Sequence, residues 1–151
     1  MANKLVVDTC VFIEAFFGDE GNDSEVMLGK LDKVGARLLF SQDTIGELMY
    51  IVKRTCNELK WSPEETNDIL QEVTSLFRLG KSVNGIYKGK DPLPLIEDLT
   101  DVMFIKASIN GRATHLVTLD HRSGILGLTD TSFKCITPSQ YLEEIQTSQE
   151  T

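Results

Sequence analysis

The chain of 151 residues has few of the residues that form disulfide frameworks or histidine-based catalytic centres. Its three cysteines, Cys10, Cys56 and Cys135, are odd in number and far apart, which fits neither a disulfide framework nor a zinc site. Two histidines, His115 and His121, and no recognisable serine or cysteine nucleophile motif leave little material for a catalytic triad. We therefore expect reduced thiols and no triad chemistry.

Long hydrophobic runs are also missing. No apolar stretch approaches the roughly 18 residues that a membrane span requires. The N-terminal "MANKLVVDTC" has no charged region followed by an uninterrupted apolar stretch and a small-residue cleavage site, so secretion is not expected. We expect a cytoplasmic protein that does not contact the membrane. Its length predicts a single domain, residues 1–146, followed by a frayed polar tail, residues 147–151.

Positive charge is scarce. The sequence has 15 lysines and arginines against 23 aspartates and glutamates, a formal net charge of −8. This excess argues against nucleic-acid binding, because affinity for phosphate normally comes from lysine and arginine. The objection loses force if several carboxylates share one metal site, because bound divalent cations would cancel part of the negative charge.

Hydrophobic patterns predict strands that alternate with helices. Continuous apolar runs rich in β-branched residues predict buried strands, at residues 4–8, 36–41, 115–120 and 134–138, with a possible short strand at 82–87. Apolar residues at helical spacing predict helices, at residues 25–34, 41–59, 61–80, 100–113 and 138–145. This order predicts an α/β domain on a parallel sheet of about five strands, with helices on both faces.

Helix-start signals support two of these helices. Ser41 or Asp43 can cap the helix at 41–59. Ser62 followed by Pro63, with Glu65 three residues after the serine, forms a capping box at the start of the next helix.

Four acidic residues are expected at one edge of the sheet. Asp8 and Asp120 directly follow predicted strands, and the carboxyl ends of parallel strands lie at the same edge. Glu47 is early in the helix after the second strand, and Asp101 begins the helix that leads into "HLVTLD". Helices that precede a parallel strand start near this same edge, so all four side chains can converge.

A hard divalent cation would make this convergence favourable. Two carboxylates about 4 Å apart repel each other by about 4 kcal/mol at an effective dielectric constant of 20. Oxygen ligands alone favour Mg²⁺ or Mn²⁺, whereas zinc would require histidine or cysteine. Each acid alone also fits a turn, a helix cap or an exposed helix face, and the shared edge is what accounts for all four together.

Several segments resemble the PIN-domain family, in particular the toxin components of toxin–antitoxin systems. The resemblance is carried by "VVDTCVFIEAFF", "SQDTIGELMYIV", "DLTDVMFIKASINGRATHLVTLD" and the closing "CITPSQYLEEI". These segments occur in the family's order and span nearly the whole chain. The resemblance implies a three-layer α/β/α sandwich, and a metal-dependent endoribonuclease that hydrolyses RNA phosphodiester bonds.

The resemblance also implies roles for individual residues. Asp8, Glu47, Asp101 and Asp120 match the family's acidic quartet, which implies that they are the catalytic residues and bind Mg²⁺ or Mn²⁺. Residues expected to support them are Asp98, Thr118, Thr9 and Ser41. Family members of this kind are often homodimers, and an antitoxin protein inhibits the toxins.

Two positions depart from the family pattern. Cys10 stands where members usually carry asparagine, and Arg122 stands where many carry an acid or asparagine. Arg122 is a candidate to bind a phosphate of the substrate. Other candidates to neutralise phosphates are Lys53, Arg54, Lys106 and Arg112. Two alternatives stay open: a catalytically weakened domain that binds another protein, and a nuclease that acts on DNA or in RNA maturation.

Overall fold

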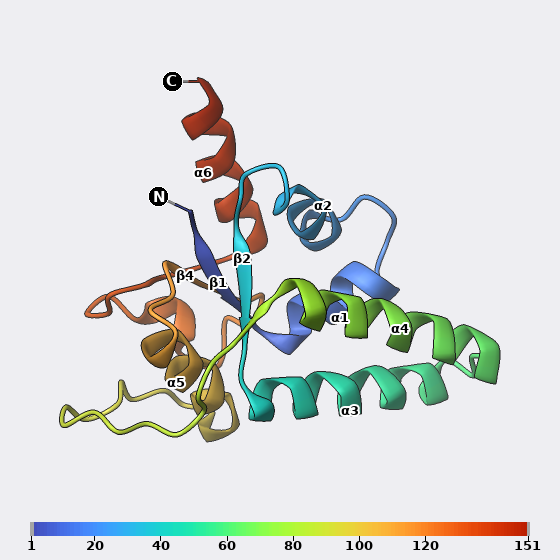
Figure 1. The fold of residues 1–151 in the computed structure, drawn as a ribbon, viewed down its shortest axis with the longest axis horizontal. Helices are drawn as coiled ribbons and strands as arrows, with labels where there is room; N and C mark the ends of the chain where they lie inside the picture. Colours follow the sequence, from blue (N-terminus) through green and yellow to red (C-terminus); the bar gives the residue numbers. More distant parts are fainter. Residues whose placement is uncertain (1, 151) are drawn as a thin grey trace.

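A computed structural model describes residues 2–150, with side chains described for residues 2–148. In this part of the chain, five parallel strands form one sheet in the order β3-β2-β1-β4-β5 (Figure 1). The strands are β1 (Lys4–Val7), β2 (Arg37–Phe40), β3 (Lys81–Ser82), β4 (His115–Val117) and β5 (Lys134–Ile136). The predicted parallel α/β sheet of about five strands is confirmed.

Helices separate the strands along the chain. The α-helices are α1 (Thr9–Phe17), α2 (Asp23–Lys30), α3 (Gln42–Glu58), α4 (Pro63–Leu79), α5 (Val102–Asn110) and α6 (Pro138–Glu150). Two short 3₁₀ turns are η1 (Leu99–Asp101), which leads into α5, and η2 (Ile125–Gly127). No helix in the described part of the chain combines the length and the apolar character needed to cross a membrane.

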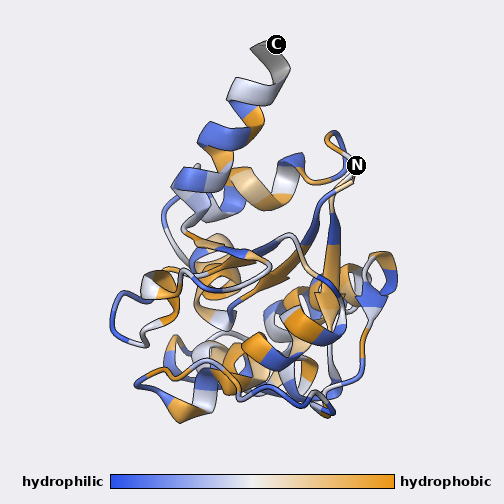
Figure 2. Cartoon of the chain, turned by 90° about the vertical axis from the view of Figure 1, so that its left-hand side faces the viewer, coloured by the Kyte–Doolittle hydropathy of each residue, from blue (hydrophilic) through white to orange (hydrophobic). Residues whose placement is uncertain are grey.

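The sheet is the middle of three layers. Alternate side chains of β1 point to opposite faces, so that Leu5 packs in one hydrophobic cluster and Val6 in another. On the Leu5 face, the cluster includes Phe12 from α1 and Leu48 from α3; on the Val6 face it includes Phe104 from α5. Figure 2 shows hydrophobic strands enclosed between helices. The three-layer sandwich is therefore confirmed.

Among the α-helices of residues 2–150, α1 alone was not predicted from the sequence pattern. Its residues "TCVFIEAFF" are mostly apolar and follow β1 with only Asp8 between them, so no clear polar face marks a helical period. Val11 and Phe12 are both buried, because β1 and the neighbouring helices enclose this short helix. The available signal was Asp8 itself, which stands at the N-cap position.

Several element boundaries differ from those predicted. Helix α2 starts earlier because the Asn22 side chain accepts a hydrogen bond from the Glu25 backbone N–H and so caps it. The possible strand at 82–87 is only Lys81–Ser82. Helix α6 continues beyond the predicted 145, to Glu150, and Thr151 of the predicted tail lies outside the described residues.

The two predicted helix starts are confirmed. Ser41 accepts from the Thr44 backbone N–H, and the Thr44 hydroxyl accepts from the Ser41 N–H, which closes a capping box on α3. Ser62 and Glu65 form the equivalent box on α4. The first box fixes the start of α3 directly after β2, and so places Glu47 on the second turn at the carboxyl edge of the sheet.

Candidate metal centre

A cleft of about 390 Å³ lies at the carboxyl edge of the sheet, and we call it the acidic cleft. Polar side chains line most of it: Asp8, Thr9, Cys10, Glu47, Asp98, Thr100, Asp101 and Asp120. Ile13 of α1 and Ile51 of α3 form its apolar wall. The four acids that the sequence predicted at this edge therefore line one cleft, together with Asp98.

Asp8 is held at the base of the cleft by its neighbours. Its backbone N–H donates to the Val117 carbonyl at 2.9 Å, which extends the pairing of β1 and β4 by one residue. The Thr118 hydroxyl donates to Asp8 Oδ2 at 2.7 Å. Burial raises the pKa of the Asp8 carboxyl, and the hydrogen bonds from Thr118 and Cys10 offset part of that effect. The Asp8 carboxylate is therefore held in one orientation and is largely shielded from water.

Thr118 connects two of the acidic residues. While its hydroxyl donates to Asp8, the same oxygen accepts from the Asp120 backbone N–H at 3.0 Å. The Asp120 carboxylate in turn accepts from the Arg122 backbone N–H at 2.8 Å, which forms a tight turn after β4. Thr118 is fully buried, so this geometry is shielded from water.

Glu47 reaches the cleft from α3. The Thr9 hydroxyl donates to Glu47 Oε2 at 2.5 Å. Thr9 begins α1 directly after Asp8, so this hydrogen bond joins the carboxyl end of β1 to the second turn of α3. Ser41 does not reach any of the acids; its hydrogen bonds go to Thr44 at the N-cap of α3.

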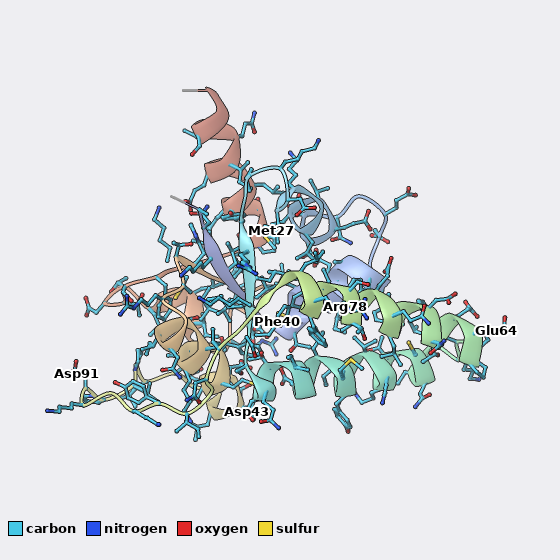
Figure 3. All side chains as sticks on the ribbon, viewed as in Figure 1. Met27, Phe40, Asp43, Glu64, Arg78 and Asp91 are labelled. Carbon is cyan, nitrogen blue, oxygen red and sulfur yellow. The ribbon has the colours of Figure 1, made fainter. Side chains whose placement is uncertain are left out.

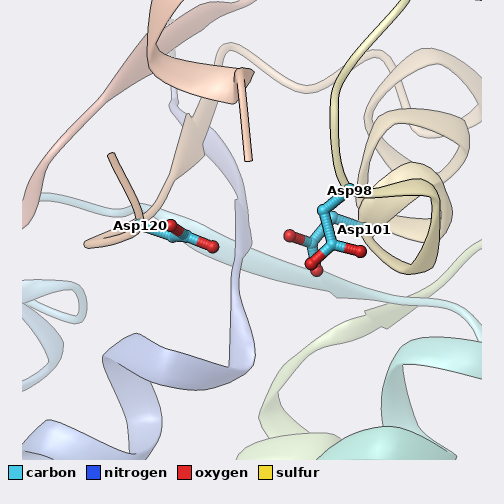
Figure 4. Close-up of side chains that lie close together, drawn as sticks. All are labelled: Asp98, Asp101 and Asp120. Carbon is cyan, nitrogen blue, oxygen red and sulfur yellow. The ribbon is translucent and has the colours of Figure 1, made fainter. Parts of the chain in front are cut away.

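Three carboxylates approach one another most closely. Asp98, Asp101 and Asp120 each offer an oxygen atom, and these atoms lie within 4.8 Å of one another. In Figure 4 the Asp98 and Asp101 side chains extend from one side of the cleft toward Asp120 on the other. Asp98 is fixed by Thr100, whose hydroxyl and backbone N–H both donate to Asp98 Oδ1.

The closeness of these groups changes their acidity. Burial raises the pKa of Asp101 to about 7, and repulsion from Asp8 and from the other carboxylates of the cleft contributes. The hydrogen bonds from Thr100 hold the pKa of Asp98 below its usual value. Burial, with the negative charge of Asp8, raises the pKa of the Cys10 thiol to about 12, so this thiol stays protonated and neutral.

Within residues 2–148, no lysine, arginine or histidine forms an ion pair with an acid of the cleft. Among the described side chains, the ion pairs are Arg54–Glu58, His115–Glu144 and Lys134–Glu144, and none includes an acid of the cleft. Five carboxylates therefore share a small volume, and none of them is paired with a basic side chain that the structure describes. Their oxygen donors, with no imidazole or thiolate among them, suit a hard divalent cation such as Mg²⁺ or Mn²⁺.

The basic residues suggested for phosphate binding lie in different places. Arg122 is exposed at the rim, two residues after Asp120. Arg54 pairs with Glu58 and lies over the Tyr50 ring, farther along α3. Sequence reasoning missed Thr100 as a cleft residue, although the order aspartate-x-threonine in "DLTD" is a known signal for a local side-chain turn.

Comparison with known proteins places the chain among related sequences and folds. The sequence profile described as "PIN domain" matches residues 4–122, a range that includes every residue of the acidic cleft. Among solved structures, the chain resembles VapBC2 from Rickettsia felis bound to a DNA fragment from their promoter, with 18% sequence identity and a TM-score of 0.58. The alignment covers 89% of this chain and 98% of the other, and at this identity it demonstrates a shared fold. No curated protein matches the chain.

Proposed function

The chain belongs to the PIN domain family, and on that premise we propose that it is a divalent-metal-dependent endoribonuclease that hydrolyses RNA phosphodiester bonds. The observation that carries the proposal is the convergence of five carboxylates in one cleft, none of which forms an ion pair with a described side chain. The mutual repulsion of these carboxylates at the carboxyl edge of the sheet is unfavourable, and a bound cation would offset it.

The cleft has suitable ligands for Mg²⁺ or Mn²⁺. Asp8, Asp101 and Asp120 would hold the ion, and Glu47 would complete the set or orient a water molecule. A bound ion of this type makes water more acidic and stabilises the negative charge that develops at the phosphate. Asp98 lies within reach of the same position, and its hydrogen bonds from Thr100 keep it ionised.

Hydrogen bonds from neighbouring hydroxyl groups hold Asp8 and Glu47 in place. Thr118 holds Asp8 through its hydroxyl and fixes the backbone of Asp120, so that both strand-end carboxylates face the cleft. Thr9 holds Glu47 in the same way. In this proposal Glu47 would accept a proton from the attacking water as the bond to phosphorus forms, and the leaving oxygen would take a proton from solvent as its bond to phosphorus breaks.

Cleavage of a mixed RNA pool in Mg²⁺ or Mn²⁺ tests the proposal. We expect the wild-type protein to fragment the RNA, and Asp8→Asn to be more than about 100-fold slower because a ligand charge is lost. Asp68→Asn, on an exposed position of α4, makes the same charge change away from the cleft and should keep full activity. Equal activity of the Asp8 variant and the wild type would reject the assignment.

We also propose that the protein is the toxin of a toxin–antitoxin pair, and that it acts in the cytoplasm as a homodimer. The fold shared with VapBC2, over nearly the whole of that chain, supports this assignment. An antitoxin encoded beside it would inhibit the nuclease. Co-expression with the product of a neighbouring small gene should suppress RNA cleavage.

Cys10 favours a second candidate, a weakened PIN domain that binds another protein. It lines the cleft with a half-buried thiol that stays neutral, and a neutral thiol contributes no metal ligand. The same assay separates the candidates, because an interaction module would not fragment RNA in either ion. A parallel pool of single-stranded DNA distinguishes a nuclease specific for RNA from one that acts on DNA.

A further inference from the structure

Positive charge is concentrated in two segments of this acidic protein. Residues 81–90 and 102–119 contain five of the 15 lysines and arginines and none of the 23 aspartates and glutamates. The five are Lys81, Lys88, Lys90, Lys106 and Arg112. The rest of the chain is therefore more negative than its net charge suggests, and any polyanion should avoid most of its surface.

The fold brings these two segments together. The Asn110 side-chain amide, at the end of α5, donates hydrogen bonds to the Asn84 and Ile86 carbonyls. Lys106, which is half-buried, lies one turn before Asn110 on the same face of α5, opposite the buried Phe104. The loop that follows β3 thus packs beside the solvent-facing side of α5. We call the five basic residues of these segments the basic surface.

The loop that carries two of these lysines is internally ordered. The Tyr87 hydroxyl donates to the Asp91 carbonyl at 2.6 Å, and the Ile86 backbone N–H donates to the Asn84 side chain. Lys88 and Lys90 are exposed between these contacts, and the Ile86 side chain is 67% exposed. In Figure 3 this loop projects from the body of the protein, with Asp91 near its tip. Exposed lysines next to apolar and aromatic side chains are typical of surfaces that bind single-stranded nucleic acid.

The basic surface and the acidic cleft are neighbours along the chain. Asp98 and Asp101 of the cleft lie between the two basic segments in sequence, and η1 leads directly from the cleft into α5. Because α5 has nine residues, it spans only about 13 Å from the cleft to its far end. A strand whose phosphate lies in the cleft can therefore reach Lys106 and the loop within a few nucleotides.

We propose that the basic surface binds the sugar–phosphate backbone of single-stranded RNA on one side of the cleavage point. This inference rests on the nuclease function proposed above and identifies where the substrate extends. Charge complementarity selects the occupant, because the surface offers five cations on a protein of net charge −8. Asp43 lies beside Gly85 and Asp91 lies at the loop tip, so two carboxylates border the surface.

The test is fluorescence anisotropy with a short fluorescein-labelled single-stranded RNA in EDTA, where cleavage cannot occur. Two paired variants make the same charge change: Lys88→Glu with Lys90→Glu on the basic surface, and, at exposed positions, Lys30→Glu at the end of α2 with Lys33→Glu in the turn that follows it. We expect the first pair to weaken binding by about tenfold or more and to flatten the salt dependence. The α2 pair should change binding by less than about twofold, and thermal unfolding should show that both proteins are folded.

Three results would overturn the proposal. Equal losses in both variants would mean that only net charge matters, and unchanged binding in the first pair would mean that RNA lies elsewhere. Displacement of the RNA by poly-glutamate as effectively as by unlabelled RNA would identify an acidic protein as the occupant. Because binding is measured without metal, the two proposals can fail separately. RNA binding that depends on Lys88 and Lys90, without any RNA cleavage in Mg²⁺ or Mn²⁺, would refute only the nuclease function. RNA cleavage by a protein whose RNA binding does not depend on these lysines would refute only the basic surface.

Discussion

At the level of one residue, Asp101 shows how the acidic cleft lowers the stability of the metal-free protein. It is buried, and its pKa of about 7 is raised from a usual value of 3.8. A carboxyl with a raised pKa favours the folded state while it is protonated, and this contribution is lost as the pH rises from about 4 to about 7. At pH 8, the ionised Asp101 therefore destabilises the protein unless a cation is bound.

Asp101→Asn should stabilise the metal-free protein. The pKa shift corresponds to at most about 4 kcal/mol, and water at the mouth of the cleft reduces the expected gain at pH 8 to about 2 kcal/mol. The gain should shrink as the pH is lowered toward 4, where Asp101 is protonated in the wild type. Urea unfolding in EDTA measures it, with Asp68→Asn as the control. A variant less stable than the wild type at pH 8 would show that Asp101 is not under electrostatic strain.

Individual site residues were predictable to different degrees. Asp8 and Asp120 follow strands, and Glu47 and Asp101 lie near helix starts, so the sheet topology alone places all four at one edge. Their hydrogen-bond partners depend on the directions of the side chains, which cannot be derived from the spacing of residues in the sequence. Thr118 and Thr9 were expected near the site, but Ser41 was expected to support a ligand and instead caps α3.

At the level of elements, two helix caps of the same type have different consequences. Ser41 and Ser62 each form a capping box, but α3 carries Glu47 into the cleft and α4 contributes no cleft residue. Ser41 is fully buried, whereas Ser62 is exposed. Disturbing the first cap should therefore affect both stability and the site, and disturbing the second should affect stability alone.

Ser41→Ala and Ser62→Ala provide this comparison. Each should lower the free energy of unfolding by about 1 kcal/mol, because one backbone N–H of each helix loses its partner. Only Ser41→Ala should also weaken Mn²⁺ binding, measured by isothermal titration calorimetry, since Glu47 lies on the second turn after this cap. If both variants bind Mn²⁺ equally well, the position of α3 does not limit the site.

The sequence indicated most elements but not all. Strands β1, β2, β4 and β5 were predicted from continuous apolar runs, and α3 and α4 from caps and an apolar stripe. Helix α1 was missed because it is short and enclosed by neighbours, so tertiary packing rather than an amphipathic pattern determines it. Strand β3 has only two residues, and its pairing with β2 cannot be inferred from local sequence.

For the whole molecule, the unequal distribution of charge matters more than the net value of −8. The sequence total argues against nucleic-acid binding, but part of the negative charge lies in the acidic cleft, where a bound cation would cancel it. Five of the 15 lysines and arginines lie on the basic surface, in segments that contain no acid. This separation depends on the fold, because residues 81–90 and 102–119 meet only through the packing of the loop against α5.

The most direct test of the central claim is an anomalous diffraction measurement on crystals of the protein soaked in Mn²⁺. We predict an anomalous peak in the acidic cleft, about 2.1 Å from oxygen atoms of Asp8, Asp101 or Asp120. The peak should be absent from crystals of the Asp8→Asn variant soaked in the same way. Wild-type crystals with no density in the cleft, or with Mn²⁺ bound only elsewhere on the surface, would contradict the claim that these carboxylates form a metal centre.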